Sequence, residues 1–273
     1  MGSDIDNILD LTKGHYEYRN QSTEPPGTYY NIAGDPLGSN EISLEVAVLN
    51  EHRFAFYYWI KWTNKLKKSK GFICPPNLVS IDWHLDLGDP EDTDLLRDVD
   101  QNNLQQVSFF SWGLLNPLND THIKSAMYLN AIKDVYLLRK QTDFDDDDKT
   151  FLDIDGNTHN IFLYKRIDTL EEDLKKINSP FYFDIDLDYF LNSTDFCGDD
   201  GQIMTKDEID KILDPERSLY ESIYKSIKGF TIAREPKWCN GLLNSNFIMD
   251  TLNENLFKGT LLKKDLIWNY KNK

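Results

Sequence analysis

Seven short apolar runs constrain the fold of this chain more than any other feature of its sequence. They span residues 46–49, 78–81, 107–110, 135–138, 161–164, 181–183 and 230–233. The runs are nearly continuous rather than alternating with polar residues, as is typical of strands that are covered on both faces. Stretches long enough to form helices separate most of them. We therefore predict a three-layer α/β/α fold with a mainly parallel sheet.

Capping residues and a proline indicate where some of the helices begin and end. The aromatic stretch 53–68 ends in lysines, which suit the negative end of a helix dipole. Thr205 and Glu208 match the capping box of a second helix. Pro215 suits the first turn of a further helix that runs toward Lys228.

One stretch does not fit the alternation of strands and helices. The aspartate-rich residues 143–148 are too charged for a core and predict a solvated loop. After them, the turn sequence Asp155-Gly156-Asn157 separates the segments 151–154 and 158–163, which indicates a small β-hairpin insertion. No repeat or linker divides the chain, so we expect residues 1–273 to form a single domain.

The composition disfavours several classes of protein. The 273 residues are 40% hydrophobic and include 6 Trp, 14 Tyr and 15 Phe, which favours a packed core over disorder. A net charge of −16 disfavours nucleic acid as a partner and suits a cationic substrate. No apolar run approaches the ~20 residues of a membrane span. Three widely spaced cysteines and no secretory signal pattern indicate a cytoplasmic location and no thiolate metal site. The oligomeric state is not predicted.

Two of the apolar runs are followed by acidic residues at alternate positions. Asp82, His84 and Asp86 follow one run, and Asp184 and Asp186 follow another. Residues two apart on an extended chain point the same way, so the members of each set can converge if the chain stays extended. Carboxylates mixed with imidazole suit divalent first-row metals, and this many acids suit two ions better than one.

Either segment alone would more often be structural, because acids at strand ends commonly cap helices and form turns. Two such segments repel each other unless cations compensate them. Two further signals occupy equivalent positions: His52 follows the run 46–49, and Glu235 follows the run 230–233 just ahead of Pro236. Ligands of parallel sheets bind at the carboxyl ends of the strands. We therefore predict a metal site there that activates water.

The order and spacing of these residues resemble the arginase–deacetylase superfamily across residues 46–236. Arginases carry an Asp-x-His-x-Asp segment after one strand and an Asp-x-Asp segment after a later one, with an upstream histidine and a downstream glutamate soon followed by proline. Some details are most similar to the arginase-like domain of peptide arginases: Asn50-Glu51-His52, Asp82-Trp83-His84 and Thr231-Ile232-Ala233-Arg234. Those enzymes convert arginine side chains in ribosomally made precursor peptides to ornithine.

The resemblance implies a centre with two manganese ions. One ion would be held by His52, Asp82, Asp86 and Asp184, and the other by Asp82, His84, Asp184 and Asp186, with Asp82 and Asp184 bridging. Glu235 is then left to bind and orient a cationic guanidinium for catalysis. Activated water would attack the guanidinium carbon, so that urea leaves and ornithine remains in an arginine-containing precursor peptide.

The loop after Asp86 departs from the free-arginine enzymes. In those enzymes it supplies polar residues that grip the α-amino and carboxylate groups of arginine, and a histidine that shuttles protons. Residues 87–94 contain no serine, asparagine or histidine. An internal arginine of a peptide lacks those free groups, so the departure favours a peptide substrate. The proton donor is left unassigned, because His122 is a candidate only by exclusion and reads more readily as a surface or helix residue.

Other functions remain open at this stage. A zinc amide hydrolase of the deacetylase branch would carry fewer acidic ligands and a Gly-Gly-Tyr segment, which this chain lacks. A ureohydrolase for free arginine or agmatine would need its substrate clamp from another loop. A phosphotransferase would leave His84 without a role. An arginase-like binding module would use the metals only for stability.

Overall fold

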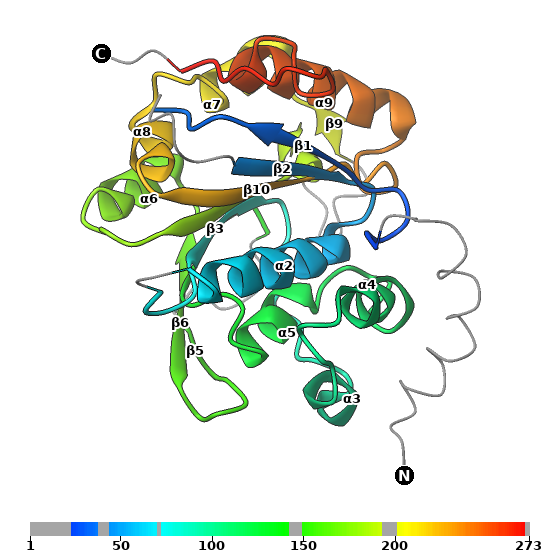
Figure 1. Ribbon diagram of the computed structural model, residues 1–273. Helices are drawn as coiled ribbons and strands as arrows, with labels where there is room; N and C mark the ends of the chain where they lie inside the picture. Colours follow the sequence, from blue (N-terminus) through cyan, green and yellow to red (C-terminus); the bar gives the residue numbers. More distant parts are fainter. Residues whose placement is uncertain (1–22, 38–43, 70–71, 142–148, 193–200, 271–273) are drawn as a thin grey trace.

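An eight-stranded sheet forms the middle layer of the structure, a computed structural model that describes residues 23–37, 44–69, 72–141, 149–192 and 201–270 (Figure 1). In sheet order the strands are β1 (Tyr29–Ala33), β2 (Leu44–Leu49), β10 (Ile227–Ala233), β7 (Phe181–Asp186), β3 (Asn77–Asp82), β4 (Val135–Arg139), β6 (Thr158–Tyr164) and β5 (Lys149–Leu152). The six inner strands are parallel to one another, and the two edge strands β1 and β5 are antiparallel to their neighbours. A separate short pair joins β8 (Leu191–Asn192) to β9 (Gln202–Ile203).

Helices cover both faces of the sheet (Figure 1). One face carries α6 (Ile167–Leu174), α7 (Lys206–Ile212), α8 (Ser218–Tyr224) and α9 (Leu242–Phe257). The other carries α2 (Ala55–Lys67), α4 (Leu104–Gly113) and α5 (His122–Tyr128), with the short α3 (Thr93–Arg97) outside them. Each face of the sheet has its own apolar core. The predicted three-layer α/β class with a mainly parallel sheet is therefore confirmed.

The contact between α2 and β10 is close enough to require glycine. A Cβ atom on Gly229 would lie 2.2 Å from the indole ring of Trp62. That ring in turn packs against Tyr182, with ring centroids 5.5 Å apart. Because α2 is pressed onto the sheet in this way, the 3₁₀ turn η1 (His52–Phe54) that precedes it is fixed at the carboxyl end of β2.

Six of the seven predicted strands are present, and the prediction for residues 107–110 is wrong. That run lies inside α4, which begins after Asn103. The side chain of Asn103 accepts a hydrogen bond from the backbone N–H of Gln106 and so caps the helix. A run of four apolar residues fits a buried strand or the buried side of a helix equally well, and here the cap decides between them.

Two of the predicted helix boundaries are confirmed, and the third is wrong. The stretch 53–68 forms η1 and α2, and Thr205 makes the capping box of α7 with Glu208. Pro215, however, lies in a turn before α8, because the Asp214 carboxylate accepts the backbone N–H of residue 216 and holds the chain there. The chain from residue 227 belongs to β10 rather than to a helix.

The predicted hairpin is present as the antiparallel pair β5–β6. The Asp153 carboxylate holds its turn by accepting the backbone N–H groups of Asp155 and Asn157. The aspartate-rich stretch 143–148 lies outside the described residues. Among the helices of the described residues, none is long and apolar enough to span a membrane.

Candidate metal centre

Polar residues from four strand ends meet at the carboxyl edge of the parallel sheet, where ligands of such sheets bind. His52 follows β2, and Glu235 follows β10. Asp82 is the last residue of β3, and Asp186 is the last residue of β7. The chain bends after Asp82 instead of staying extended as predicted. The ligand atoms of Asp82, His84 and Asp86 nevertheless lie within 4.8 Å of one another.

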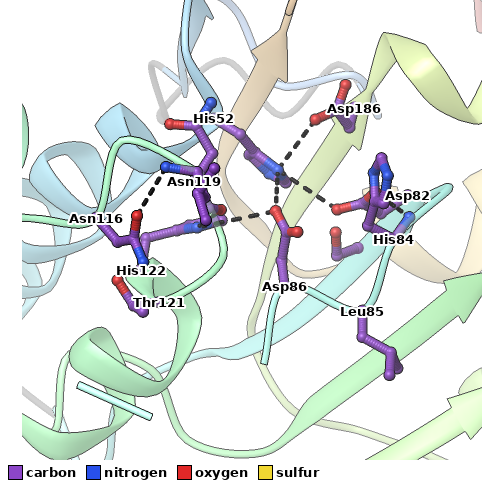
Figure 2. A network of polar contacts seen from close by, with 12 residues as sticks. His52, Asp82, His84, Leu85, Asp86, Asn116, Asn119, Thr121, His122 and Asp186 are labelled. Atoms are coloured by element: carbon purple, nitrogen blue, oxygen red, sulfur yellow. Dashed lines mark hydrogen bonds and ion pairs between the residues drawn. The ribbon is translucent and has the colours of Figure 1, made fainter. Parts of the chain in front are cut away.

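The imidazole of His52 faces three carboxylates (Figure 2). Its Nδ1 atom lies 3.0 Å from Asp86 Oδ2, 3.1 Å from Asp186 Oδ2 and 3.4 Å from Asp82 Oδ2. His52 and Asp82 are fully buried, and Asp186 is 1% exposed. Three acids from two different strands therefore point at one ring nitrogen.

Asp184 contacts the opposite side of the same ring. Its Oδ2 atom lies 2.8 Å from His52 Nε2 and accepts a hydrogen bond from Ser80 Oγ at 2.7 Å. Its Oδ1 atom accepts a hydrogen bond from Thr231 Oγ1 at 2.5 Å. None of the potential ligand groups within the described residues includes Asp184. The structure thus places this residue on the far side of His52 from the other acids, and the bridging role that the resemblance implies for it stays a prediction.

Asp188 was not predicted from the sequence to be a ligand, yet its side chain lies in the site. β7 ends at Asp186, and the 3₁₀ turn η2 (Leu187–Phe190) brings Asp188 toward the same centre. Its Oδ2 atom lies 2.8 Å from His84 Nδ1. Asp188 also forms a potential ligand group with Asp186 and Glu235. The pattern of acids at alternate positions extends to residue 188, so the signal was present in the sequence.

The donor set suits divalent cations. It combines carboxylate oxygens with imidazole nitrogens, and the described residues contribute no thiolate to it. One oxygen of Asp82, Oδ2, is buried and has no hydrogen-bond partner among the described residues. A buried carboxylate oxygen without a partner is costly unless a cation satisfies it. These residues therefore fit a metal centre.

Burial and mutual repulsion dominate the electrostatics of the site. Burial raises the pKa of Asp82, Asp86 and Asp186, and the charge of a neighbouring aspartate raises each of them further. Burial alone would lower the pKa of His84, but the Asp188 carboxylate outweighs it and raises that pKa to about 11. The pKa of His52 is likewise held well above its ordinary value, chiefly by Asp184 acting against burial. Bound cations would relieve this crowding of negative charge.

Glu235 lies at the edge of the centre in a left-handed backbone conformation with φ of 34°. Its Oε1 atom accepts a hydrogen bond from the backbone N–H of His52 at 2.7 Å and another from the side-chain amide of Asn119. Burial, reinforced by the charge of Asp186, raises its pKa well above the ordinary value. Asn119 belongs to the loop before α5, and sequence reasoning missed it because a lone asparagine in a loop carries no distinctive signal.

His122 is buried beside the centre rather than lying on the surface (Figure 2). Its ring centroid lies 4.3 Å from that of His52, and its other face stacks on Trp59 at 5.6 Å. Its Nδ1 atom lies 2.8 Å from the Asn119 carbonyl oxygen and 3.9 Å from Asp86 Oδ2. Burial and the charge of His52 lower its pKa well below the ordinary value. His122 is the first residue of α5, so the expectation of a helix residue is confirmed and that of a surface residue is wrong.

His159 does not belong to the site. His159 lies in the β5–β6 hairpin, where its ring nitrogens contact the Lys133 carbonyl oxygen and the Asp153 carboxylate. His15 lies outside the described residues.

A cavity of about 550 Å³ opens onto the centre. Its wall includes His84, Asp86 and Glu235 from the centre itself. The rest of the lining is mixed, with the apolar side chains of Leu85, Leu87, Leu118 and Trp238 and the charged or polar side chains of Asp120, Lys124, Gln141 and Lys149. The Oδ1 atom of Asp120 is buried and has no hydrogen-bond partner among the described residues. The cavity therefore suits a long side chain with an apolar stem and a hydrogen-bond donor at its end.

Comparison with known proteins gives a structural likeness but no sequence match. No family model matches the chain, and no curated protein matches it. Among solved structures, it is similar to proclavaminate amidino hydrolase from Streptomyces clavuligerus, with 12% sequence identity and a TM-score of 0.41. The match covers 75% of this chain and 59% of that one. Any activity proposed for this chain therefore rests on the geometry of its own residues.

Proposed function

We propose that this protein is a metal-dependent hydrolase that acts on the guanidinium group of arginine residues in a peptide and produces urea and ornithine. One observation carries the proposal: two histidines and several buried carboxylates converge at one end of a cavity, next to the further carboxylate of Glu235. A metal centre beside a carboxylate that can pair with a cation is what hydrolysis of a guanidinium requires.

We assign two sets of four ligands from side chains whose ligand atoms lie close together. One set consists of His52, Asp82, Asp86 and Asp186, and the other of Asp82, His84, Asp186 and Asp188. His122 forms a further close group with His52 and Asp86. The four aspartates balance the charge of two dications, which leaves Glu235 free. Oxygen and imidazole donors accept manganese. When bound, two such ions supply a nucleophile at neutral pH by lowering the pKa of water.

Glu235 is proposed to orient the substrate. The backbone N–H of His52 and the amide of Asn119 both donate to Oε1, which fixes that oxygen and leaves Oε2 free of hydrogen bonds from the described residues. Oε2 can accept a charge-assisted N–H bond from a guanidinium and hold its carbon near the metal centre. The neighbouring apolar wall of Leu85 and Trp238 would pack along the methylene stem of arginine and exclude water.

The shape of the loop after Asp86 supports a peptide substrate. Leu87 and Gly88 of this loop line the cavity and offer no polar side chain to a free α-amino or carboxylate group. The backbone N–H of Gly88 donates to the Asp120 carbonyl oxygen at 2.7 Å, and a Cβ atom at this position would lie 3.0 Å from that oxygen. The loop is thereby held against the start of α5.

The proposal is tested by metal analysis together with urea release. Purified protein should contain two manganese ions per chain and should release urea from a blocked peptide with an internal arginine. The ratio kcat/KM for that peptide should exceed the ratio for free arginine by orders of magnitude. A single stoichiometric zinc ion, or the absence of urea from either substrate in metal-loaded protein, would refute the proposal. Comparable turnover of free arginine would refute its peptide part.

A further inference from the structure

Two lysines line the cavity at the end away from the metal centre. Lys149 is the first residue of the edge strand β5, which stands three places from β3 in the sheet. Lys124 lies on α5 and reaches an outer partner, Asp89, whose side chain is 82% exposed. The acids of the centre follow the inner strands β3, β7 and β10, whereas the two ammonium groups line the cavity away from them. The Asp120 carboxylate also lines this cavity.

The two lysines are neighbours in space. Lys149 and Phe151 are two residues apart on β5, so their side chains project from the same face of the strand. Both are half-buried, whereas the residues that alternate with them are exposed. The ammonium group of Lys124 lies 5.8 Å from the centroid of the Phe151 ring. Lys124 and Lys149 thus flank the same aromatic side chain.

Lys149 has no ion-pair partner among the described residues. Lys124 makes an ion pair with Asp89 at 2.7 Å. The chain as a whole carries a charge of −16, so two cations in the wall of one cavity differ from its overall acidic character. An ammonium group there can form charge-assisted hydrogen bonds with a negatively charged ligand.

We propose that Lys124 and Lys149 form a carboxylate subsite, so that the preferred substrate carries a carboxylate as well as a guanidinium. This inference rests on the proposed function and narrows its substrate class. In a peptide the carboxylate has two possible sources: an aspartate or glutamate next to the arginine, or the C-terminal carboxylate when the arginine is the last residue. Both bring a negative charge beyond the arginine stem, while Glu235 holds the guanidinium.

Four blocked substrates test the subsite in manganese-loaded protein. Nα-acetyl-arginine is compared with its amide, and a capped Gly-Arg-Asp-Gly peptide is compared with its Asn counterpart. We expect the carboxylate member of at least one pair to have a higher kcat/KM through a lower KM, on the order of tenfold, as one charge-assisted hydrogen bond would give. The pair that shows the preference identifies the source. Equal kcat/KM within both pairs would overturn the proposal.

Variants then locate the preference. Lys149→Gln should remove most of it, and Lys124→Gln should reduce it. Lys228→Gln is the matched control. Lys228 lies near the amino end of β10, whereas the metal centre lies at the carboxyl ends of the strands, so this variant should keep the full preference. A preference that survives in the Lys124→Gln/Lys149→Gln double variant would also overturn the proposal.

Calorimetric binding of the same four compounds separates this inference from the proposed function. Tighter binding of the carboxylate compounds without urea release would support the subsite while refuting the hydrolase. Urea release at equal rates from the carboxylate and amide compounds would support the hydrolase while refuting the subsite.

Discussion

Replacing Asp184 with asparagine tests whether this residue binds metal or holds His52. In the structure its two oxygens contact His52 Nε2, Ser80 Oγ and Thr231 Oγ1. An N–H at His52 Nε2 that donates to Asp184 leaves the lone pair of Nδ1 facing the three acids of the centre. An asparagine that presents its amide N–H to Nε2 forces the proton onto Nδ1, where it competes with a metal ion.

The expected effect is moderate. Loss of a carboxylate behind a metal-binding histidine typically weakens metal affinity by about 10–100-fold, which corresponds to about 1.4–2.8 kcal/mol. Asparagine has the shape of aspartate, and a rotated amide can place its N–H groups toward the Thr231 hydroxyl instead. Asp184→Asn should therefore still bind two ions at high manganese concentration, with the ion beside His52 bound more weakly.

Asp186→Asn is the matched control, because it also neutralises one buried carboxylate of the same strand. Asp186 lies 3.1 Å from His52 Nδ1 and belongs to two potential ligand groups, so its loss should affect both ions. Elemental analysis after dialysis, followed by manganese titration of the apoprotein, measures stoichiometry and affinity. If Asp184→Asn lost both ions while Asp186→Asn retained them, the assignment of the two residues would be reversed.

Three further predictions concern the substrate, the packing and the pH dependence of stability. Glu235→Gln should retain both metal ions and lose turnover by about a hundredfold or more, because an amide cannot pair with a guanidinium; near-normal urea release would contradict this role. Gly229→Ala should lower the free energy of unfolding by about 1–3 kcal/mol, because the new Cβ would lie 2.2 Å from Trp62; an unchanged denaturation midpoint would show that the ring moves aside. Burial raises the pKa of Glu45, but its hydrogen bonds, chiefly from Lys61, outweigh burial and leave the pKa below the ordinary value. Its contribution to stability is therefore present above the unfolded pKa of about 4.3 and lost as the pH falls through the lower folded pKa. Thermal unfolding of the wild type and Glu45→Gln should then differ at neutral pH and converge below about pH 3, and a constant difference would refute this reasoning.

The parallel sheet could be predicted from the sequence because burial on both faces leaves a continuous apolar run, a signal that depends on composition alone. The wrong prediction of a strand at 107–110 shows the limit of that signal. Four apolar residues are too few to distinguish the 3.6-residue period of a helix from the 2-residue period of a strand. The structure shows a helix there, capped by the Asn103 side chain, which accepts the backbone N–H of Gln106. The edge strand β1 was missed for the opposite reason, since Tyr29, Tyr30 and Ile32 are largely exposed and its burial pattern is irregular.

Asn119 and His122 show what the sequence could not reveal about the site. Both come from a loop and a helix start that no strand-end signal marks, and both reach the centre only through tertiary packing. His122 stacks on Trp59 of α2 and contacts the tilted ring of His52 in η1, so its position depends on how closely α2 lies on the sheet. Burial of this kind is a property of the packed fold and not of the local sequence.

The choice between Asp184 and Asp188 depends on where β7 ends. Within a strand, Asp184 and Asp186 share a face, but Asp184 lies one step deeper in the sheet, level with Ser80 on β3 and Thr231 on β10. At that depth it contacts the hydroxyl groups of Ser80 and Thr231 and the Nε2 atom of His52. The strand stops at Asp186, and η2 then brings Asp188 to His84. Four aspartates still face the centre, so the charge balance proposed for two dications is unchanged. Asp184 instead contacts His52 Nε2 from behind, so the residue at which β7 ends determines which aspartates can face the centre.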